Sequence, residues 1–247
     1  MKLDILAFGV HPDDVELSCT GVLLVEKNNG NKTGIIDLTA GELGTRGTGE
    51  IRKIEAAKAA KILGVDIREN LGMADGFLQN DEVHQRKIIT VLRTYQPEII
   101  LCNAPEDRHP DHGRSSKLVA EAAFLSGLQK IQTEHNGVEQ GAWRPKYVFR
   151  YIQDRFLQPD FVVDITDVFE QKLEAIKAYK SQFVQSPGDG LNTAEPETYI
   201  STPEFLDSVI YRHKWFGKMI GVKYAEGFIS DKVVGLKNFD AIIKQNT

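Results

Sequence analysis

The stretch "LDILAFGVHPDDVEL", residues 3–17, contains an apolar run, a polar turn and the beginning of a helix-period segment. The run at 3–10 predicts a strand buried on both faces, because short apolar runs bounded by turn residues are typical of such strands. The segment 15–29 predicts a helix that ends at Gly30. A strand that leads directly into a helix is half of a β-α-β unit, so this stretch favours an α/β fold.

The same alternation continues along the chain. Apolar runs predict strands at 33–40, 65–70, 97–103, 146–152, 160–166 and 224–230, and helix-period segments predict helices at 49–64, 81–95, 110–127, 167–182 and 203–219. We expect one domain, residues 1–247, with a Rossmann-like three-layer α/β/α fold. Its sheet should be mostly parallel, with strand order 3-2-1-4-5 and a C-terminal extension. Residues 183–203, with several Pro and Gly, predict a long loop of the kind that often contacts substrate.

The composition excludes several classes of partner. The chain has 247 residues, a net charge of −5 and a pI near 5.7, which argues against a nucleic-acid surface. No stretch has the features of a signal peptide or the ~20 apolar residues of a membrane span, so we expect a cytoplasmic protein without a membrane partner. Cys19 and Cys102 have no C-x-x-C partner, which predicts two reduced, buried thiols.

The tripeptide His-Pro-Asp occurs twice, at 11–13 and again at 109–111 within "EDRHPDHGRSS" (106–116). Each copy follows the carboxyl end of a predicted strand and precedes a predicted helix. In a sheet of the expected order the first and fourth strands are neighbours, and a crevice opens between their carboxyl ends. The two motifs are therefore predicted to face each other across that crevice.

The residue types in the two motifs fit a metal site. Catalytic zinc usually takes three protein ligands and keeps one position open, and His11 and Asp14, three residues apart on one turn, predict two of them. His112 on the other loop is the predicted third ligand. Iron or manganese also suit such a nitrogen and oxygen site. Asp13 remains beside the metal as the predicted general base.

Two motif residues are left for other tasks. His109 is predicted to stabilise an oxyanion or to donate a proton to a leaving amine, with Asp111 to orient it. The alternative interpretation is structural: the aspartates of both motifs would cap two helices, Pro110 would occupy a first helical turn, and the histidines would have no shared role.

The paired "HPDD" and "HPDH" motifs resemble those of the LmbE/PIG-L family of zinc-dependent N-acetylglucosamine deacetylases. The resemblance extends over essentially the whole chain and includes "GELGTRGT" (41–48), "RKIEAAKAAKILGV" (52–65) and "GVKYAEGF" (221–228). It is strongest to the bacillithiol-biosynthesis branch, which removes the acetyl group from N-acetylglucosaminyl-malate. The resemblance implies one Zn²⁺ per chain, the same division of roles among the motif residues, a small GlcNAc-conjugate substrate and a homo-oligomer, with hexamers expected.

The resemblance also implies that Arg52 and Asp75 hold sugar hydroxyl groups. Malate brings two carboxylates, for which a forked Arg side chain is suited, and Arg108 and Arg46 are the candidates. A solvated Arg52 and a turn role for Asp75 remain open from the residues alone. The predicted function is therefore hydrolysis of an N-acetyl group on a GlcNAc conjugate. The alternatives are deacetylation or amide hydrolysis of another GlcNAc or thiol conjugate, and a sugar-binding module without catalysis.

Overall fold

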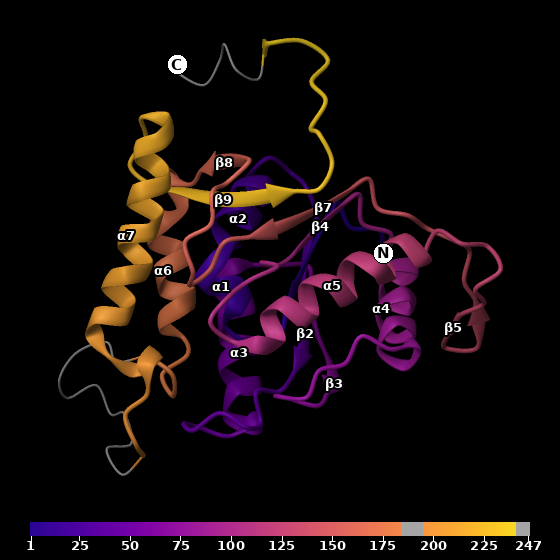
Figure 1. Cartoon of the computed structure of the whole chain (residues 1–247), viewed down its shortest axis with the longest axis horizontal. Coiled ribbons are helices and arrows are strands. Elements are labelled where there is room, and N and C mark those ends of the chain that lie inside the picture. The colour runs from indigo at the N-terminus through magenta and orange to yellow at the C-terminus, as the bar shows by residue number, and fades with distance from the viewer. Residues whose placement is uncertain (184–194, 241–247) are drawn as a thin grey trace.

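The structure, a computed structural model, describes residues 1–183 and 195–240 and is built on a central sheet of order β3-β2-β1-β4-β7-β9-β8 (Figure 1). The strands are β1 (Ile5–Gly9), β2 (Thr33–Thr39), β3 (Ile67–Met73), β4 (Ile99–Asn103), β7 (Tyr147–Tyr151), β8 (Phe161–Asp164) and β9 (Ala225–Ser230). Strands β3, β2, β1, β4 and β7 are parallel to one another, whereas β9 is antiparallel to β7 and β8. The expected mostly parallel sheet of order 3-2-1-4-5 is confirmed, with β7 as its fifth strand and β9 and β8 in the C-terminal extension.

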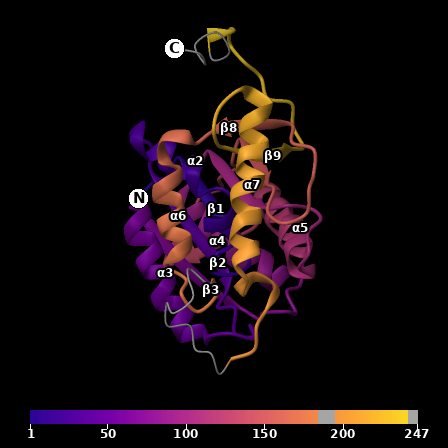
Figure 2. The same cartoon turned by 90° about the vertical axis from the view of Figure 1, so that its left-hand side faces the viewer.

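Helices cover both faces of this sheet. They are α1 (Asp14–Ser18), α2 (Thr20–Asn28), α3 (Gly49–Leu63), α4 (Glu82–Tyr95), α5 (Pro110–Leu125), α6 (Phe169–Lys177) and α7 (Pro203–Ile220). Short 3₁₀ turns are η1 (Thr166–Val168) and η2 (Tyr199–Ser201), and β5 (Glu134–His135) pairs with β6 (Val138–Glu139) outside the main sheet. Figure 2 shows α2, α3, α6 and α7 on one side of the sheet. The helices α4 and α5 pack on the other side.

The alternation of side chains along β1 explains why both faces need a cover. Ile5 and Ala7 pack with buried residues of α1, α2, α3 and α6, whereas Leu6 and Phe8 pack with buried residues of α4 and α5. All four side chains are nearly inaccessible to water. A strand buried on both faces lies in the middle of the sheet, so the polar turn that follows it opens at the centre of the molecule.

The predicted helix 15–29 is interrupted at Cys19, where the backbone leaves helical geometry with φ −136°. The acceptor for the new helix end comes from the last strand, because the N–H groups of Gly21 and Val22 each donate to the Glu226 carboxylate at 2.8 Å. A Cβ on Gly21 would lie 2.7 Å from that carboxylate, so only glycine fits here. Lys172, fully buried on α6, neutralises Glu226 at 2.9 Å.

Other boundaries also differ from the expectation. The strand predicted at 65–70 is β3, which runs instead from Ile67 to Met73. The helix predicted at 167–182 begins as η1 and ends at Lys177, because Tyr179 turns into the core and the main chain of Ser181 donates to Glu55 of α3 at 2.7 Å. Of the predicted loop 183–203, residues 184–194 lie outside the described part.

Two further predictions concern the cysteines and the membrane. Both cysteines, Cys19 and Cys102, are free and buried, as predicted. Within residues 1–183 and 195–240, no helix combines the length and the apolar character that crossing a bilayer requires.

Candidate metal centre and active site

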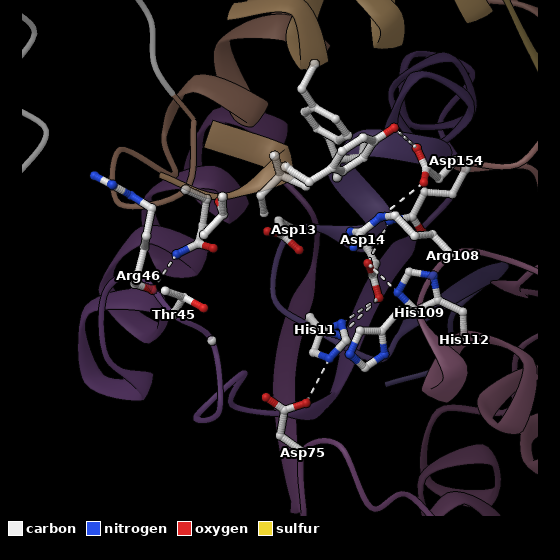
Figure 3. Close-up of a pocket in the computed structure, with 18 of the residues that line it drawn as sticks. His11, Asp13, Asp14, Thr45, Arg46, Asp75, Arg108, His109, His112 and Asp154 are labelled. Atoms are coloured by element: carbon white, nitrogen blue, oxygen red, sulfur yellow. Dashed lines mark hydrogen bonds and ion pairs between the residues drawn. The ribbon is translucent and has the colours of Figure 1, made fainter. Parts of the chain in front are cut away.

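The two His-Pro-Asp motifs meet at one edge of the sheet. Strand β1 pairs in parallel with β4, from Ile5 opposite Ile99 to Ala7 opposite Leu101, so the turns after these strands lie side by side. The rings of His11 and His112 are 5.6 Å apart between centroids. Figure 3 shows these rings beside His109 and the carboxylate of Asp14. The strand order therefore brings the two motifs together, as predicted.

Asp14 is the buried carboxylate between the two motif loops. Its oxygens lie 3.2 Å from Nε2 of His112 and 3.6 Å from Nδ1 of His11. They also accept hydrogen bonds from the side-chain amides of Asn103, at 3.2 Å, and Gln153, at 2.8 Å. Burial opposes ionisation, but the charge of His112 and the hydrogen bonds of both rings outweigh it and hold the Asp14 pKa well below its ordinary value. His11 and His112, one from each motif, therefore both lie against the Asp14 carboxylate, each on a different oxygen.

A second carboxylate contacts each of these histidines at the ring nitrogen that does not face Asp14. Nε2 of His11 lies 2.9 Å from Asp75, and Nδ1 of His112 lies 2.7 Å from Asp107. Carboxylates of this kind set the tautomer and orientation of metal-binding histidines. Burial lowers the pKa of each ring, but the carboxylates outweigh burial and raise the pKa of His11 to about 9 and that of His112 to about 10.

The two carboxylates that support the histidines are Asp75, which was predicted for another role, and Asp107, which was not predicted. Asp75 was predicted to hold a sugar hydroxyl, and in the structure it contacts His11 and accepts the N–H of Leu43 at 2.9 Å. Asp107 was not predicted at all. Its only sequence signal is a carboxylate two residues before the second motif, and its contact with His112 depends on the fold of the loop. Asp107 Oδ1 also accepts main-chain N–H groups of Arg108 and Arg155, at 2.8 and 3.0 Å.

His109 lies as near to the other histidines as they lie to each other. Its ring centroid is 4.7 Å from that of His11 and 5.5 Å from that of His112. His11, His109 and His112 each offer one nitrogen within 4.8 Å of the others, so the geometry allows a three-histidine donor set beside the predicted one. His11, Asp75 and Asp111 also bring one donor atom each within that distance of one another.

Asp13 occupies a strained and buried position. Its φ of +129° is rare for a residue with a side chain, and it marks the sharp turn between β1 and α1. Nη2 of Arg52 lies 2.8 Å from Oδ2, which accepts no well-directed hydrogen bond from the described residues. Burial raises the pKa of Asp13 to about 7, although Arg52 opposes this rise. A carboxylate in this condition can accept a proton near neutral pH.

The helix-cap interpretation of the aspartates does not fit the structure. Asp13 makes no side-chain bond to the helix end, and Asp14 Oδ2 accepts the N–H of His11, which precedes the helix. The cap of α5 is His109, whose Nδ1 accepts the N–H of Asp111 at 3.2 Å, with Pro110 in the first turn as expected.

Asp111 and His109 are therefore joined through the main chain of Asp111. The carboxylate of Asp111 instead accepts a hydrogen bond from Arg114 at 2.6 Å, and its other oxygen is buried without a partner among the described residues. Since Nδ1 of His109 is an acceptor, its Nε2 carries the proton of the neutral ring. Burial and the neighbouring histidines lower the pKa of His109, which favours that neutral form.

A cavity of about 380 Å³ opens above these groups, within the usual size of small-molecule sites. The predicted substrate arginines all line it. Arg52 pairs with Asp13 and donates to the carbonyl of Pro12 at 2.6 Å. Arg46 donates to main-chain carbonyls of Ser181, Glu195 and Pro196, which ties the Gly-rich loop to the C-terminal segment.

Arg108 stands at the rim of the cavity and is nearly half exposed. Its Nε lies 3.1 Å from Asp154, and its guanidinium covers the ring of Tyr199 at 4.7 Å. The hydroxyl of Tyr199 donates to the other oxygen of Asp154 at 3.1 Å.

Comparison with known proteins gives a consistent result. The family model described as PIG-L, GlcNAc-PI de-N-acetylase, matches residues 6–123. A diacetylchitobiose deacetylase of Thermococcus kodakarensis is 30% identical over 234 residues, which cover 90% of this chain and 81% of that protein. The chain belongs to the PIG-L family.

Further proteins resemble this PIG-L chain at lower identity or in structure. A probable N-acetyl-α-D-glucosaminyl L-malate deacetylase of Bacillus cereus is 26% identical over 196 residues, 74% of this chain and 84% of that one. A 4-oxalmesaconate hydratase of Pseudomonas putida is 27% identical over 192 residues, 72% of this chain and 73% of that one. The solved structure of the conserved protein TT1542 from Thermus thermophilus superposes with a TM-score of 0.81 at 35% identity, covering 95% of this chain and 98% of that one.

Proposed function

We propose that this chain is a metal-dependent N-deacetylase that hydrolyses the acetamide of a GlcNAc conjugate. Within that class we propose N-acetylglucosaminyl-malate as the substrate, with glucosaminyl-malate and acetate as products. The observation that carries the proposal is the convergence of His11 and His112, from separate loops, on the buried Asp14, with the ionisable Asp13 adjacent. Similarity to curated deacetylases supports the reaction class.

The donor set fits a divalent metal ion. Two imidazole nitrogens and one carboxylate oxygen suit Zn²⁺, and iron or manganese also bind such sets. The buried histidines carry protons in the metal-free protein, since each lies against carboxylates, so metal binding should release protons. When bound, the ion would polarise the acetamide carbonyl and lower the pKa of a coordinated water toward ~7. We infer one Zn²⁺ per chain on His11, Asp14 and His112.

We assign the proton transfers to Asp13. Its carboxylate accepts a proton from the attacking water as the water oxygen bonds to the carbonyl carbon. The Arg52 contact holds the carboxylate in place and stabilises its charged form. The proton then passes to the amine nitrogen as the C–N bond breaks, so acetate and a free amine leave.

We assign stabilisation of the tetrahedral intermediate to His109. Its Nδ1 accepts the N–H of Asp111, so the proton of the neutral ring is on Nε2, and the residue lines the cavity. An N–H held in this way can donate to the developing oxyanion. Asp111 supports this role through its main chain, and Arg52 and Asp75 remain proposed contacts of the sugar.

The test combines metal content with product analysis. Purified protein should contain close to one zinc per chain, and it should release acetate from N-acetylglucosaminyl-malate faster than from N-acetylglucosamine. Asp13→Asn should keep the metal and lose about 10²–10⁴-fold in turnover, because the amide cannot act as a base. Lys117→Gln, on the exposed surface of α5, is a control and should match the wild type. A fully active Asp13→Asn enzyme contradicts the mechanism.

A hydratase is the second candidate, because one relative of similar identity carries that name. The same metal and Asp13 would then activate water for addition to a carbon–carbon double bond. Incubation with 4-oxalmesaconate separates the two candidates: loss of its conjugated absorbance, without acetate release from GlcNAc conjugates, would favour the hydratase. The expected homo-oligomer, including the hexamer, stays a prediction.

A further inference from the structure

The arginines that line the cavity differ in the partners they have in the described part of the chain. Four arginines line the cavity, at positions 46, 52, 108 and 212. Arg52 pairs with Asp13, Arg108 pairs with Asp154, and Arg46 is bound to main-chain carbonyls. Arg212, on α7, has no carboxylate oxygen within 4.0 Å among the residues the structure describes.

The contacts of Arg212 hold it in place without neutralising it. Its Nη2 donates to the carbonyl of Leu17 at 2.8 Å, and its Nε is buried without a hydrogen-bond partner in the described part of the chain. Burial lowers its pKa to about 10, so the guanidinium is still charged at neutral pH.

The carboxylates whose charge acts most strongly on Arg212 are Asp154 and Asp107, and both are already engaged. Asp154 uses one oxygen for Arg108 and the other for the Tyr199 hydroxyl. Asp107 uses one oxygen for His112 and the other for two main-chain N–H groups. Neither carboxylate can turn to Arg212 without leaving another cation or donor unpaired.

A partly buried guanidinium without a carboxylate partner is costly, and a ligand carboxylate relieves that cost. Arginine also binds carboxylates through two parallel N–H groups, which fixes their orientation. A neutral disaccharide offers no such group. The cavity therefore favours a substrate that carries a negative charge.

We propose that Arg212 is the specificity-determining residue of this cavity and binds a carboxylate of the group attached to the amino sugar. The inference rests on the proposed deacetylase function and names its substrate class: anionic GlcNAc conjugates rather than neutral ones. Arg108, at the cavity rim, is already neutralised by Asp154, so Arg212 makes the larger contribution.

Binding to metal-free protein tests the proposal apart from catalysis. Calorimetric titrations of chelator-treated protein use N-acetylglucosaminyl-malate and the methyl glycoside of N-acetylglucosamine. We expect wild type to bind the malate conjugate more tightly, and Arg212→Gln to weaken that binding about 10- to 100-fold while leaving the methyl glycoside unchanged. Lys218→Gln, which removes an exposed charge from the same helix, should behave as wild type. Arg212→Lys, which keeps the charge without the fork, should fall between and decides the case if Arg212→Gln does not fold.

The outcomes separate the two claims. Equal weakening of both ligands by Arg212→Gln, no weakening of either, or wild-type protein without preference for the malate conjugate would overturn the role of Arg212. A preference that depends on Arg212, in a protein that releases no acetate from either ligand when loaded with zinc, would uphold that role and reject the deacetylase function.

Discussion

Replacing Lys172 by Met should strongly destabilise the protein, because it leaves the Glu226 carboxylate without its cation. Both side chains have no exposed surface, and the pair is 2.9 Å apart. Lys172 also donates to the carbonyl of Glu16 at 2.7 Å, which the variant leaves unpaired. Removing one partner of a buried pair costs about 3–5 kcal/mol of unfolding free energy. For a chain of this size, each kcal/mol lowers the melting temperature by about 2–4 °C, so the expected decrease is roughly 6–20 °C.

Urea unfolding at pH 7.5, followed by far-ultraviolet circular dichroism, measures this effect. The control is Lys146→Met, because Lys146 pairs with Glu98 on the surface, where its side chain is 69% exposed. Such exposed pairs contribute about 1 kcal/mol or less. The double variant Lys172→Met with Glu226→Gln removes both charges and keeps an acceptor for α2, so it should recover roughly half of the loss.

The result that would refute the reasoning is a Lys172→Met protein within about 1 kcal/mol of wild type, the scale of the surface control. It would mean that Glu226 does not need a cation in the folded state. A double variant whose loss of stability equals the sum of the losses in the two single variants would also count against it, since the two substitutions would then act independently.

Three further predictions concern the metal and the pH dependence. His112→Ala should lose bound zinc whereas His109→Ala should keep it, by elemental analysis; loss of zinc in both variants would favour the three-histidine donor set. Asp107→Asn should weaken zinc binding about 10- to 100-fold in a competition titration with a chelator, because His112 loses its orienting carboxylate; unchanged affinity would show that Asp107 does not support the ligand. Burial holds the pKa of His213 well below its ordinary value, so only the unfolded chain takes up this proton as pH falls below about 6.5, and stability should fall by up to ~1.4 kcal/mol per pH unit. His213→Gln should make that fall shallower in urea titrations between pH 7.5 and 5; an identical slope would exclude His213 as the cause.

Local patterns and common topology were enough to predict much of the fold. The apolar run before His11 marks a strand buried on both faces. The expected strand order also places β1 next to β4, as the structure has them. The break at Cys19 could not be predicted, because the acceptor that allows it belongs to Glu226, 205 residues away from Gly21.

The sequence predicted part of the candidate site, namely its residues, but not how those residues contact one another. The two motifs predicted which polar groups gather, but local patterns do not specify the partner of each group. Asp107 and Arg212 were missed because their significance lies in contacts that only the folded chain brings about. Asp75 and Arg46 line the cavity as expected, yet Asp75 contacts His11 and Arg46 donates to main-chain carbonyls. Their roles toward substrate stay predictions.

The bond between Glu226 and the start of α2 has a consequence for how the protein is made. The ribosome releases the first motif early, but the carboxylate that satisfies Gly21 and Val22 emerges some 200 residues later. Gln153, which holds Asp14, also follows long after it. Domains generally fold as units, and during synthesis the N-terminal part of the chain is available first. Here the start of α2, shortly after the first motif, is synthesised early, but its N–H groups gain their acceptor only when β9 is in place.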